Sequence, residues 1–325
     1  MAISIPVRTT CIRPLDVRRD LLPVADLIEL CFRNTMDKDG REYVRQIRRA
    51  ANNFSSLRWI AGANERVSFP LHGYVWEDEG QVVGNLSLIP FYRRGKWRYL
   101  IANVAVHPNY RRRGIGRKLT EKALEHIRDH GVPSAWLQVR DDNPIAYNLY
   151  CSLGFIERVR RATWVSTDPT SAITGPIRNV KVNITQRAPQ DWELQETWLR
   201  EIYPPEVTWN LPIKIDRYKP TFWRGFMHFL NGEQTRHWAA HLDNQLLGLI
   251  TWEPGHNRVD NLWIATTEAH ENQVLPALLT KARNWADDQR ILVANYPAER
   301  ARQTFQRSGF EQQNVLIWME AKLTD

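Results

Sequence analysis

The strongest constraint on the fold of this chain is a pattern that occurs twice. Three segments of its first half are matched, in the same order, by segments of its second half. The pairs are GQVVGNLSLI and NQLLGLITW (80–89 and 244–252), ANVAVHP and DNLWIAT (102–108 and 260–266), and CSLGFIE and QRSGFEQ (151–157 and 306–312). In the first pair Gly84 matches Gly248. Three ordered matches at corresponding elements predict two copies of one fold.

The expected boundary between the copies lies in STDPTSAITGPIRN, residues 166–179, which lose hydrophobic periodicity and collect Ser, Thr, Pro and Gly. A length of 325 residues also exceeds the usual size of one domain. We therefore expect a first domain at 1–166, a linker at 167–179 and a second domain at 180–325.

The first half reads as a mixed α/β domain that begins with antiparallel strands. LHGYVWEDEG and QVVGNLSLIPFYR form two strand patterns separated by a Glu-Gly turn, which predicts a hairpin. The other expected strands are 10–13, 97–107, 134–141 and 156–165, and the expected helices are 20–32, 40–51, 115–130 and a short one after Asn143.

Between a strand and a helix stands NVAVHPNYRRRGIGRKL, which places three arginines against two glycines. A helix start offers free N–H groups and the positive end of the helix dipole. Glycines allow close approach of the backbone, and arginines add charge-assisted hydrogen bonds. The pattern predicts a phosphate-bearing ligand. It lacks the Lys-Ser/Thr ending of a Walker loop, and Leu119 stands where a dinucleotide fingerprint has its third glycine.

The charge and composition of the chain agree with an anionic ligand but do not identify that ligand. The formal net charge is +8. Three cysteines without metal-type spacing indicate reduced thiols, the N-terminus lacks an apolar core of signal-peptide length, and no apolar run reaches membrane-spanning length. From this we expect a cytoplasmic protein that does not bind a membrane.

Arg111-x-x-Gly114-x-Gly116 matches the R/Q-x-x-G-x-G/A motif of the GNAT superfamily of acyl-CoA-dependent N-acyltransferases, and residues 10–166 resemble that family throughout. The resemblance implies two tandem GNAT folds, each with a mixed α+β sheet. It also implies acetyl-CoA as co-substrate, with its pyrophosphate at the arginine-glycine turn, no metal, and direct attack of a primary amine on the thioester.

The resemblance extends to individual cofactor-binding positions. In the family a bulge splays two strands, the first of these strands pairs with the pantetheine arm, and the turn that follows binds pyrophosphate. The matching residues here are Val104, Ala105 and Val106 for the strand, and Arg111, Arg112, Arg113, Gly114, Ile115, Gly116 and Arg117 for the turn. The Val106 N–H would be the oxyanion donor. Asn143 matches a pantetheine ligand and also suits a helix N-cap, and the two roles are compatible.

Tyr150 stands four residues before Gly154-Phe155, where the family keeps the tyrosine that protonates the departing thiolate. The alternative for Tyr150 is an aromatic that packs on the helix. We expect Tyr147, one turn earlier, to pack, and Cys151 to be a small core residue and not a nucleophile.

The chain departs from many relatives at the positions of the general base. Ala102, Asn103 and Gln138 stand where those relatives have a carboxylate. The proton could leave through water or reach Glu77, Asp141 or Asp142, and the sequence does not rank them. An α-amino group, with a pKa of about 7.7–8.0, would need less help than a lysine at about 10.4.

The second copy lacks the motif. AHENQV at 269–274 replaces the turn, and Phe305 stands where the first copy has Tyr150. We therefore expect a catalytically inactive copy. Its aromatic segment at 203–230 suits packing between domains or a wall of the acceptor groove, and we expect His237 and His241, which lie in a strand pattern, to be structural.

Three function classes remain. The first is an acetyl-CoA-dependent N-acetyltransferase whose block from 136 to 155 most resembles ribosomal-protein N-terminal acetyltransferases, with a small amine or a protein N-terminus as acceptor. The second is a non-catalytic acyl-CoA sensor, which the missing carboxylate favours. The third is a nucleic-acid binder, favoured by basicity and disfavoured because the arginines of the turn have no aromatics among them.

Overall fold

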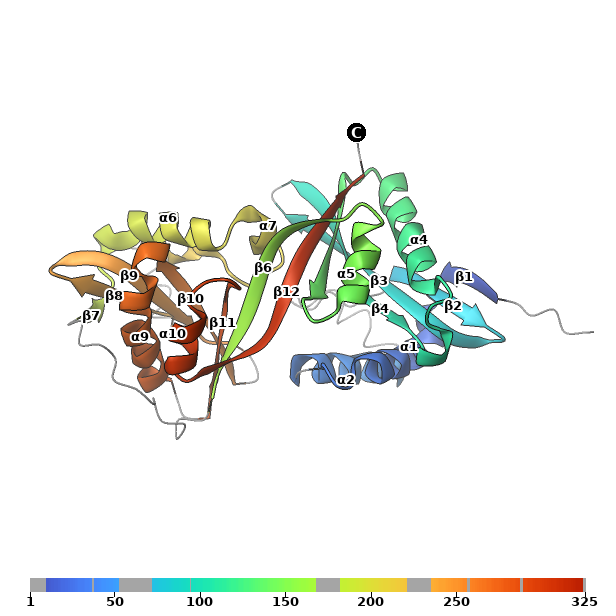
Figure 1. Ribbon diagram of the computed structural model, residues 1–325, viewed down its shortest axis with the longest axis horizontal. Coiled ribbons are helices and arrows are strands. Elements are labelled where there is room, and N and C mark those ends of the chain that lie inside the picture. The colour runs from blue at the N-terminus through green and yellow to red at the C-terminus, as the bar shows by residue number, and fades with distance from the viewer. Residues whose placement is uncertain are drawn as a thin grey trace, which may run out of the picture. The chain divides into compact units, whose positions relative to one another are not determined.

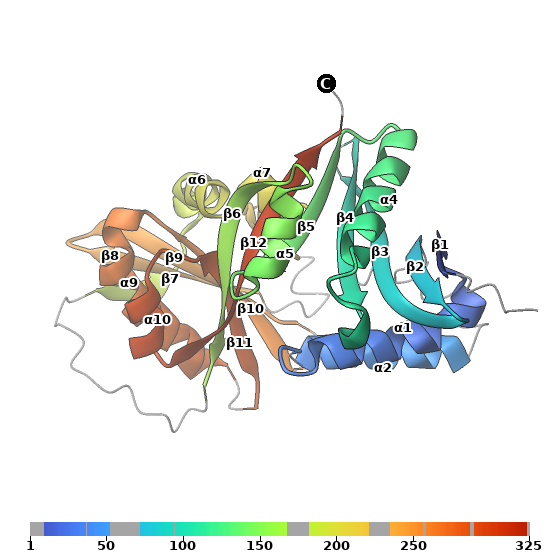
Figure 2. The ribbon, with the colours of Figure 1, turned by 45° about the vertical axis from the view of Figure 1, so that its right-hand side comes forward.

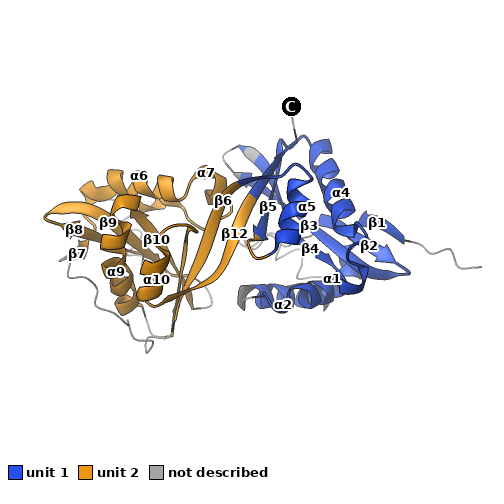
Figure 3. Cartoon of the chain, viewed as in Figure 1, with its two compact units in different colours: residues 1–139, 143–157, 319–325 blue, residues 140–142, 158–318 orange. Residues whose placement is uncertain are grey.

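A computed structural model describes residues 10–323, except residues 37, 53–71, 94, 168–181, 221–234, 256–257 and 287–288. The chain divides into two compact units, whose elements are labelled in Figure 1 and coloured by unit in Figure 3. Unit 1 contains Met1–Val139, Asn143–Glu157 and Met319–Asp325, and unit 2 contains Arg140–Asp142 and Arg158–Trp318.

Unit 1 follows the order of elements that the sequence predicts. Along the chain these are β1 (Thr10–Pro14), α1 (Val17–Phe32), α2 (Lys38–Asn52), β2 (His72–Asp78), β3 (Gln81–Arg93), β4 (Lys96–Val106), a 3₁₀ turn (Pro108–Tyr110), α4 (Ile115–Asp129), β5 (Ser134–Arg140), α5 (Pro144–Cys151) and the start of β6 (Ile156–Ser166). The predicted hairpin between β2 and β3 is confirmed. Its two turn residues, Glu79 and Gly80, both have positive φ (49° and 81°), as the tightest hairpin turns require.

The sheet of unit 1 is covered on both faces. Its strands are ordered β1-β2-β3-β4-β5, antiparallel up to the parallel pair of β4 and β5. Successive side chains of a strand point to opposite faces. Val75 of β2 packs against α1 and α2, whereas the next residue, Trp76, lies under the Lys118 ammonium of α4. Helices α1 and α2 therefore cover one face, and α4 covers the other.

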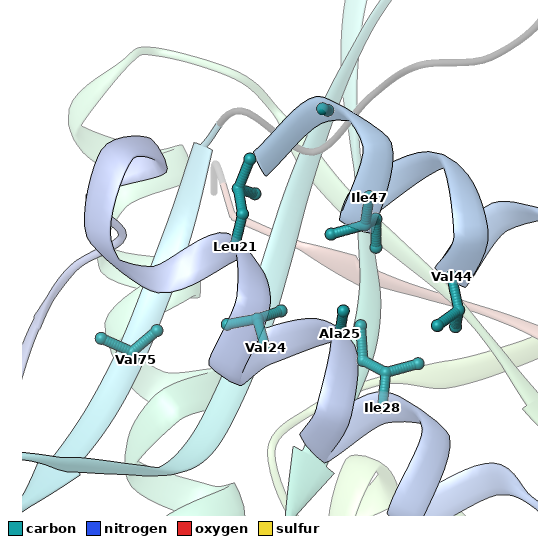
Figure 4. Packing of buried hydrophobic residues seen from close by; sticks show 8 residues of the cluster. Leu21, Val24, Ala25, Ile28, Val44, Ile47 and Val75 are labelled. Carbon is teal, nitrogen blue, oxygen red and sulfur yellow. The ribbon is translucent and has the colours of Figure 1, made fainter. Parts of the chain in front are cut away.

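The core under α1 and α2 arises from helical periodicity. Leu21, Val24, Ala25 and Ile28 recur at the three- and four-residue spacing of one helix face. In Figure 4 they meet Val44 and Ile47 of α2 and Val75 of β2, and all seven side chains are buried. This packing fixes α1 and α2 against the sheet beside β4.

Unit 2 repeats much of this order. Its elements are β7 (Asn183–Gln186), a 3₁₀ turn (Pro189–Asp191), α6 (Trp192–Ile202), α7 (Pro205–Thr208), a 3₁₀ turn (Ile215–Tyr218), β8 (Arg236–Leu242), β9 (Gln245–Glu253), β10 (Val259–Thr266), α9 (Glu268–Trp285), β11 (Ile291–Pro297), α10 (Arg302–Arg307) and most of β12 (Phe310–Lys322). The strands are ordered β12-β6-β11-β10-β9-β8-β7.

The predicted match of Gly84 and Gly248 is seen in detail. A Cβ on Gly84 would meet the Ile115 side chain of α4 at 2.9 Å, and one on Gly248 would meet Val274 of α9 at 2.8 Å. In both units the hairpin register shifts one step beyond the glycine. Both glycines thus let a helix approach the same strand of a repeated fold, which supports the two-copy interpretation.

The last strand of each repeat does not stay with its own repeat. Strand β6, from the first repeat, pairs antiparallel with β11 in unit 2, where Trp164 stacks on Phe305 at 4.8 Å. The end of β12, from the second repeat, belongs to unit 1, where the Leu323 N–H donates to the Pro133 carbonyl at 2.8 Å. The compact units therefore differ from a simple division of the chain near residue 166.

Residues 168–181 lie outside the described residues, so the linker expected at 167–179 stays a prediction, as do the domain boundaries that depend on it. The same holds for residues 221–230 of the aromatic segment. Within the residues that are described, no helix is both long and apolar enough to cross a membrane.

Candidate active site

Strand β4 carries a bulge beside its open edge. The pairing of β3 with β4 shifts between Asn85 and Ser87, and Asn103 there has a left-handed φ of 52°. The parallel pairing of β4 with β5 ends at Ile101 and Leu137, so Ala102–Val106 run on without β5. Both strands and the nearby helix α5 can be followed in Figure 2. The bulge and the early end of pairing leave one edge of β4 open for a ligand.

The hydrogen-bond pattern between β3 and β4 shows which residues of β4 direct their main chain to the open edge. The His107 N–H donates to the Val83 carbonyl at 2.9 Å, so the alternation of an antiparallel pair turns the N–H and C=O of Val106 away from β3. Ala105, the neighbouring residue, pairs with Asn85 of β3. Of the three strand residues named from the sequence, Val104 and Val106 thus point their main chain to the open edge, and Ala105 points its own toward β3.

Two side chains converge on the Val106 carbonyl. The Cys31 thiol of α1 donates to it at 3.3 Å, and the Arg111 Nε donates at 3.2 Å. Burial raises the pKa of the Cys31 thiol, which keeps it protonated as a donor. These contacts hold the end of β4 in place and direct Arg111 toward the same edge. Cys31 was not identified from the sequence, because nothing in its helix pattern distinguishes it from a core residue.

The turn before α4 presents backbone donors. Its N-cap is Gly114, with φ of 78° and no side chain to cap the helix, and the first helical hydrogen bond runs from the Lys118 N–H to the Gly114 carbonyl. The N–H groups of residues 115–117 therefore lack a helical partner. A Cβ on Gly116 would meet protein atoms only at 3.6 Å or more, so the packing of the protein does not itself require glycine there.

Positive charge surrounds these donors. Arg113 donates to the Asn109 carbonyl at 3.1 Å, and Arg117 donates to the Ser152 hydroxyl at 2.6 Å. The Arg112 side chain has no hydrogen-bond or ion-pair partner among the described residues and is exposed. Free N–H groups, the dipole of α4 and several arginines together form a site for a phosphate-type anion.

Helix α5 carries two of the predicted residues, Asn143 as its N-cap and Tyr150 near its end. The Asn143 Oδ1 accepts from the Ala146 N–H at 3.1 Å, which confirms the N-cap, while its amide Nδ2 keeps the capacity to donate to a ligand. Tyr150 is 6% exposed, and its hydroxyl has no partner among the described residues. Burial raises the pKa of Tyr150 to about 12, so the hydroxyl is protonated at any working pH.

Tyr147 and Cys151 differ from Tyr150 in their surroundings. The Tyr147 hydroxyl donates to Glu157 at 3.3 Å, and Cys151 is an exposed free thiol. Hydrogen bonding to Cys151 raises the pKa of Tyr147. The exposure of Cys151 contradicts the prediction of a core residue, because α5 turns this position to solvent while Tyr150 faces inward.

Two of the carboxylates considered as proton acceptors are engaged elsewhere. Hydrogen bonds from Arg19 and Arg13 lower the pKa of Glu77. A bidentate pair with Arg140, at 2.9 and 2.7 Å, lowers the pKa of Asp142. Carboxylates held by guanidinium groups are poor bases. Water and the exposed Asp141 are left as acceptors of the proton from the amine.

A network of uncharged, hydrogen-bonded side chains occupies the position where many relatives have a carboxylate base. The Asn103 amide donates to the Tyr43 hydroxyl of α2 at 2.7 Å and to Ser87 at 3.3 Å, and the Asn85 amide donates to the Asn103 carbonyl at 3.0 Å. The buried Asn85 Oδ1 has no partner among the described residues. The network therefore secures the bulge. Tyr43 and Asn85 were missed from the sequence because only the register shift brings them to Asn103.

Unit 2 differs at each of these points. Its β9–β10 ladder runs from Glu253 and Asn261 to Gly248 and Thr266 without a shift. Val274 of α9 takes the place of Ile115 of α4 over the strand glycine. Because α4 begins at Ile115 itself and α9 begins at Glu268, α9 has six additional helical residues before the equivalent position. Helical turns thus replace the phosphate-type loop.

A carboxylate is buried within those extra turns. Glu271 is 3% exposed and accepts hydrogen bonds from the Tyr296 hydroxyl and the Arg300 Nε, both at 2.9 Å. Phe305, the counterpart of Tyr150, is fully buried and has no hydroxyl. Glu271 forms a salt bridge with Arg300 at 2.8 Å, so a paired carboxylate stands near this helix start in place of the arginines of the turn in unit 1.

A mixed sheet opened beside a bulged strand, with a glycine-arginine turn starting the next helix, defines the GNAT class of fold. Residues 35–155 match the family model described as acetyltransferase (GNAT) family. This segment, which is less than half of the chain, is similar to the GNAT family.

Individual proteins show the same similarity. The chain is 45% identical over 67 residues to ribosomal protein bS18-alanine N-acetyltransferase of Escherichia coli (strain K12), which is 20% of this chain and 45% of that protein. The match thus spans less than half of that relative. The solved GCN5-related N-acetyltransferase from Sphaerobacter thermophilus aligns with a TM-score of 0.56 and 14% identity over 97% of this chain and 96% of its own.

The tandem arrangement also has a structural counterpart. A tandem GNAT protein from the clavulanic acid biosynthesis pathway aligns with a TM-score of 0.51 and 17% identity, over 98% of this chain and 99% of its own. Identities this low show the fold alone. They agree with two GNAT folds in one chain.

Proposed function

We propose that unit 1 is an N-acetyltransferase that moves the acetyl group of acetyl-CoA to a primary amine. The observation that carries the proposal is the open edge of β4 followed in the chain by the uncapped, arginine-rich start of α4. Acyl transfer from coenzyme A uses a site that binds the phosphates of the carrier and a donor that protonates the departing thiolate. The start of α4 is proposed for the first role and Tyr150 for the second.

The proposed reaction is a direct transfer. The amine nitrogen attacks the thioester carbonyl carbon, and the Val106 N–H stabilises the oxygen as it gains negative charge. The C–N bond forms, the C–S bond breaks, and the thiolate takes the Tyr150 proton. The extra proton of the amine leaves to water. Residues 111–117 and the Asn143 amide hold the carrier in place.

The acceptor proposed is an α-amino group, as on a protein N-terminus. The relative from Escherichia coli is named for an alanine of a ribosomal protein. The neutral network of Tyr43 and Asn103 offers no base, and an α-amino group, with a pKa of about 7.7–8.0, is partly uncharged at neutral pH without one.

Unit 2 is proposed to bind no acetyl-CoA. The missing bulge, the helical turns in place of the loop and the buried Glu271 support this. We expect calorimetric titration of the full chain to give one acetyl-CoA per chain, and two sites of similar affinity would contradict the assignment to unit 1.

Thiol release from acetyl-CoA, measured over alanine-first peptides, small amines and polyamines, tests the activity itself. Release that needs an amine, with one acetyl group gained per thiol, is expected. Tight binding of one acetyl-CoA without release by any amine would instead establish the alternative, a non-catalytic acyl-CoA sensor, which the engagement of Glu77 and Asp142 by arginines favours.

The network at the bulge gives a smaller prediction. Tyr43→Phe removes the hydroxyl that accepts from Asn103, and a lost hydrogen bond of about 1 kcal/mol predicts a fall in kcat/KM of about fivefold. Tyr74→Phe is the matched control, because the Tyr74 hydroxyl bonds His126 near the far end of α4. Equal losses in the two variants would show that Tyr43 has no particular role at the bulge.

A further inference from the structure

The carbonyl oxygen of Val106 accepts two side-chain hydrogen bonds at the open edge of β4. The Arg111 Nε donates to it at 3.2 Å, and the Cys31 thiol donates at 3.3 Å. A peptide carbonyl has two lone pairs. The two side chains therefore use the whole acceptor capacity of this oxygen, and none is left for a ligand that pairs with the strand.

The same peptide group is also held from the side of β3. The His107 N–H, which lies in one peptide plane with the Val106 carbonyl, donates to the Val83 carbonyl at 2.9 Å. Because a peptide group is planar, it cannot turn about its axis without breaking one of these contacts. The peptide between residues 106 and 107 is thus fixed by β3 on one side and by Cys31 and Arg111 on the other.

These contacts make residue 106 a position that can only donate. The N–H of Val106 points to the same open edge as its carbonyl, because the ladder turns both groups away from β3. The carbonyl is occupied, so the N–H is the main-chain group of Val106 that can meet a ligand. A lone donor selects an oxygen acceptor, and it stabilises best an oxygen that gains negative charge.

We propose that the Arg111 side chain is a positioning residue that acts on Val106 and is not a phosphate ligand. By holding the Val106 carbonyl, it keeps the Val106 N–H directed at the thioester oxygen, and this inference rests on the proposed acetyl transfer. The main chain of residue 111 stays in the proposed carrier site, where the other arginines of the turn supply the positive charge. Burial raises the pKa of the Cys31 thiol, so the second donor stays protonated.

Arg111→Gln and Arg111→Met separate the donor from the charge. Both variants lose the positive charge, but the Nε2 of glutamine lies as many bonds from Cα as the Nε of arginine, whereas methionine has no donor. We expect the kcat of Arg111→Met to fall about fivefold below that of Arg111→Gln, the effect of one hydrogen bond. Calorimetry should give the two variants the same affinity for acetyl-CoA within about twofold, because their charge is the same.

Arg128→Gln and Arg128→Met are the matched controls. Arg128 is an exposed arginine in the last turn of α4, at the end opposite to the arginine-glycine turn. These two variants should agree with each other, both in kcat and in affinity, within about twofold.

The contact itself can be observed without any activity. Valine followed by histidine occurs once in the sequence, at 106–107, so carbon-13 at the valine carbonyls and nitrogen-15 in the histidines give one correlated resonance, from this peptide. Loss of a hydrogen bond moves a carbonyl resonance upfield. We expect an upfield shift in Arg111→Met and in Cys31→Ala, and a resonance close to that of the unmodified chain in Arg111→Gln.

Two results would overturn the inference. One is an equal kcat in Arg111→Gln and Arg111→Met with an equal, large loss of affinity for acetyl-CoA, which would make Arg111 a phosphate ligand that acts through its charge. The other is a carbonyl resonance that does not respond to Arg111→Met. An unmodified chain that acetylates no amine would contradict the proposed function instead, and the resonance would still decide whether Arg111 holds Val106.

Discussion

Tyr150→Phe is expected to lower kcat by about 10²- to 10⁴-fold at saturating substrates, with little change in affinity for acetyl-CoA. The substitution keeps the buried ring, which meets Phe155 at 5.8 Å, and removes only the hydroxyl. Steady-state kinetics with the best amine of the screen, together with calorimetry for the cofactor, measures both quantities. A kcat within about twofold, where chemistry limits the rate, would show that Tyr150 is not the acid.

Tyr147→Phe is the matched control for Tyr150. Tyr147 lies one turn earlier in α5, but its hydroxyl is directed to Glu157. Its loss is expected to change kcat by less than about threefold, the effect of one long, part-buried hydrogen bond.

The raised pKa of Tyr150 sets the direction of the pH dependence. Because burial raises this pKa to about 12, the acid form persists through alkaline pH, and Tyr150 should cause no fall in kcat below about pH 10. A loss of kcat near pH 9 that disappears in Tyr150→Phe would contradict this.

Gly114→Asp is expected to weaken acetyl-CoA binding by about 100-fold. Gly114 caps α4 in the left-handed region, with φ of 78°, so any side chain there adds strain, and a carboxylate adds repulsion toward phosphate at the helix start. The space around its Cβ position is open, so the folded structure can hold the variant. Calorimetric titration with acetyl-CoA measures the loss.

Gln273→Asp is the matched control in unit 2. When Val274 is superposed on Ile115, Gln273 takes the position of Gly114, on the exposed side of a helix. Affinity is expected to stay within about twofold, because that unit is proposed to hold no cofactor. Equal losses in the two variants would show that the turn at Gly114 is not the phosphate site.

Much of the fold could be predicted because its signals are local. The Glu79-Gly80 turn, the Asn143 cap with Pro144, and the apolar spacing of α1 each depend on residues within a few positions of one another. The family motif added the position of the phosphate-type turn. Cys151 was placed wrongly because its exposure depends on which side of α5 faces the sheet.

The candidate site was predictable in part for the same reason. The motif located the turn at 111–117 and the tyrosine at 150, but Cys31, Tyr43 and Asn85 reach β4 from elements far away in sequence. Their contacts with Val106 and Asn103 exist because α1, α2 and β3 are packed around the bulge. No spacing within the chain reveals a register shift between two strands.

By itself, the sequence determined that the chain contains a repeated fold, where the Glu79-Gly80 turn lies and where α4 and α5 begin, and that one repeat carries the glycine-arginine turn. These properties follow from backbone preferences and periodicity over short distances. Tertiary structure alone decided that β6 pairs in unit 2, that Asn103 opens the edge of β4, and that Glu271 is buried against Arg300. Those outcomes depend on strand register and side-chain packing between distant segments, which are set only when the sheet assembles.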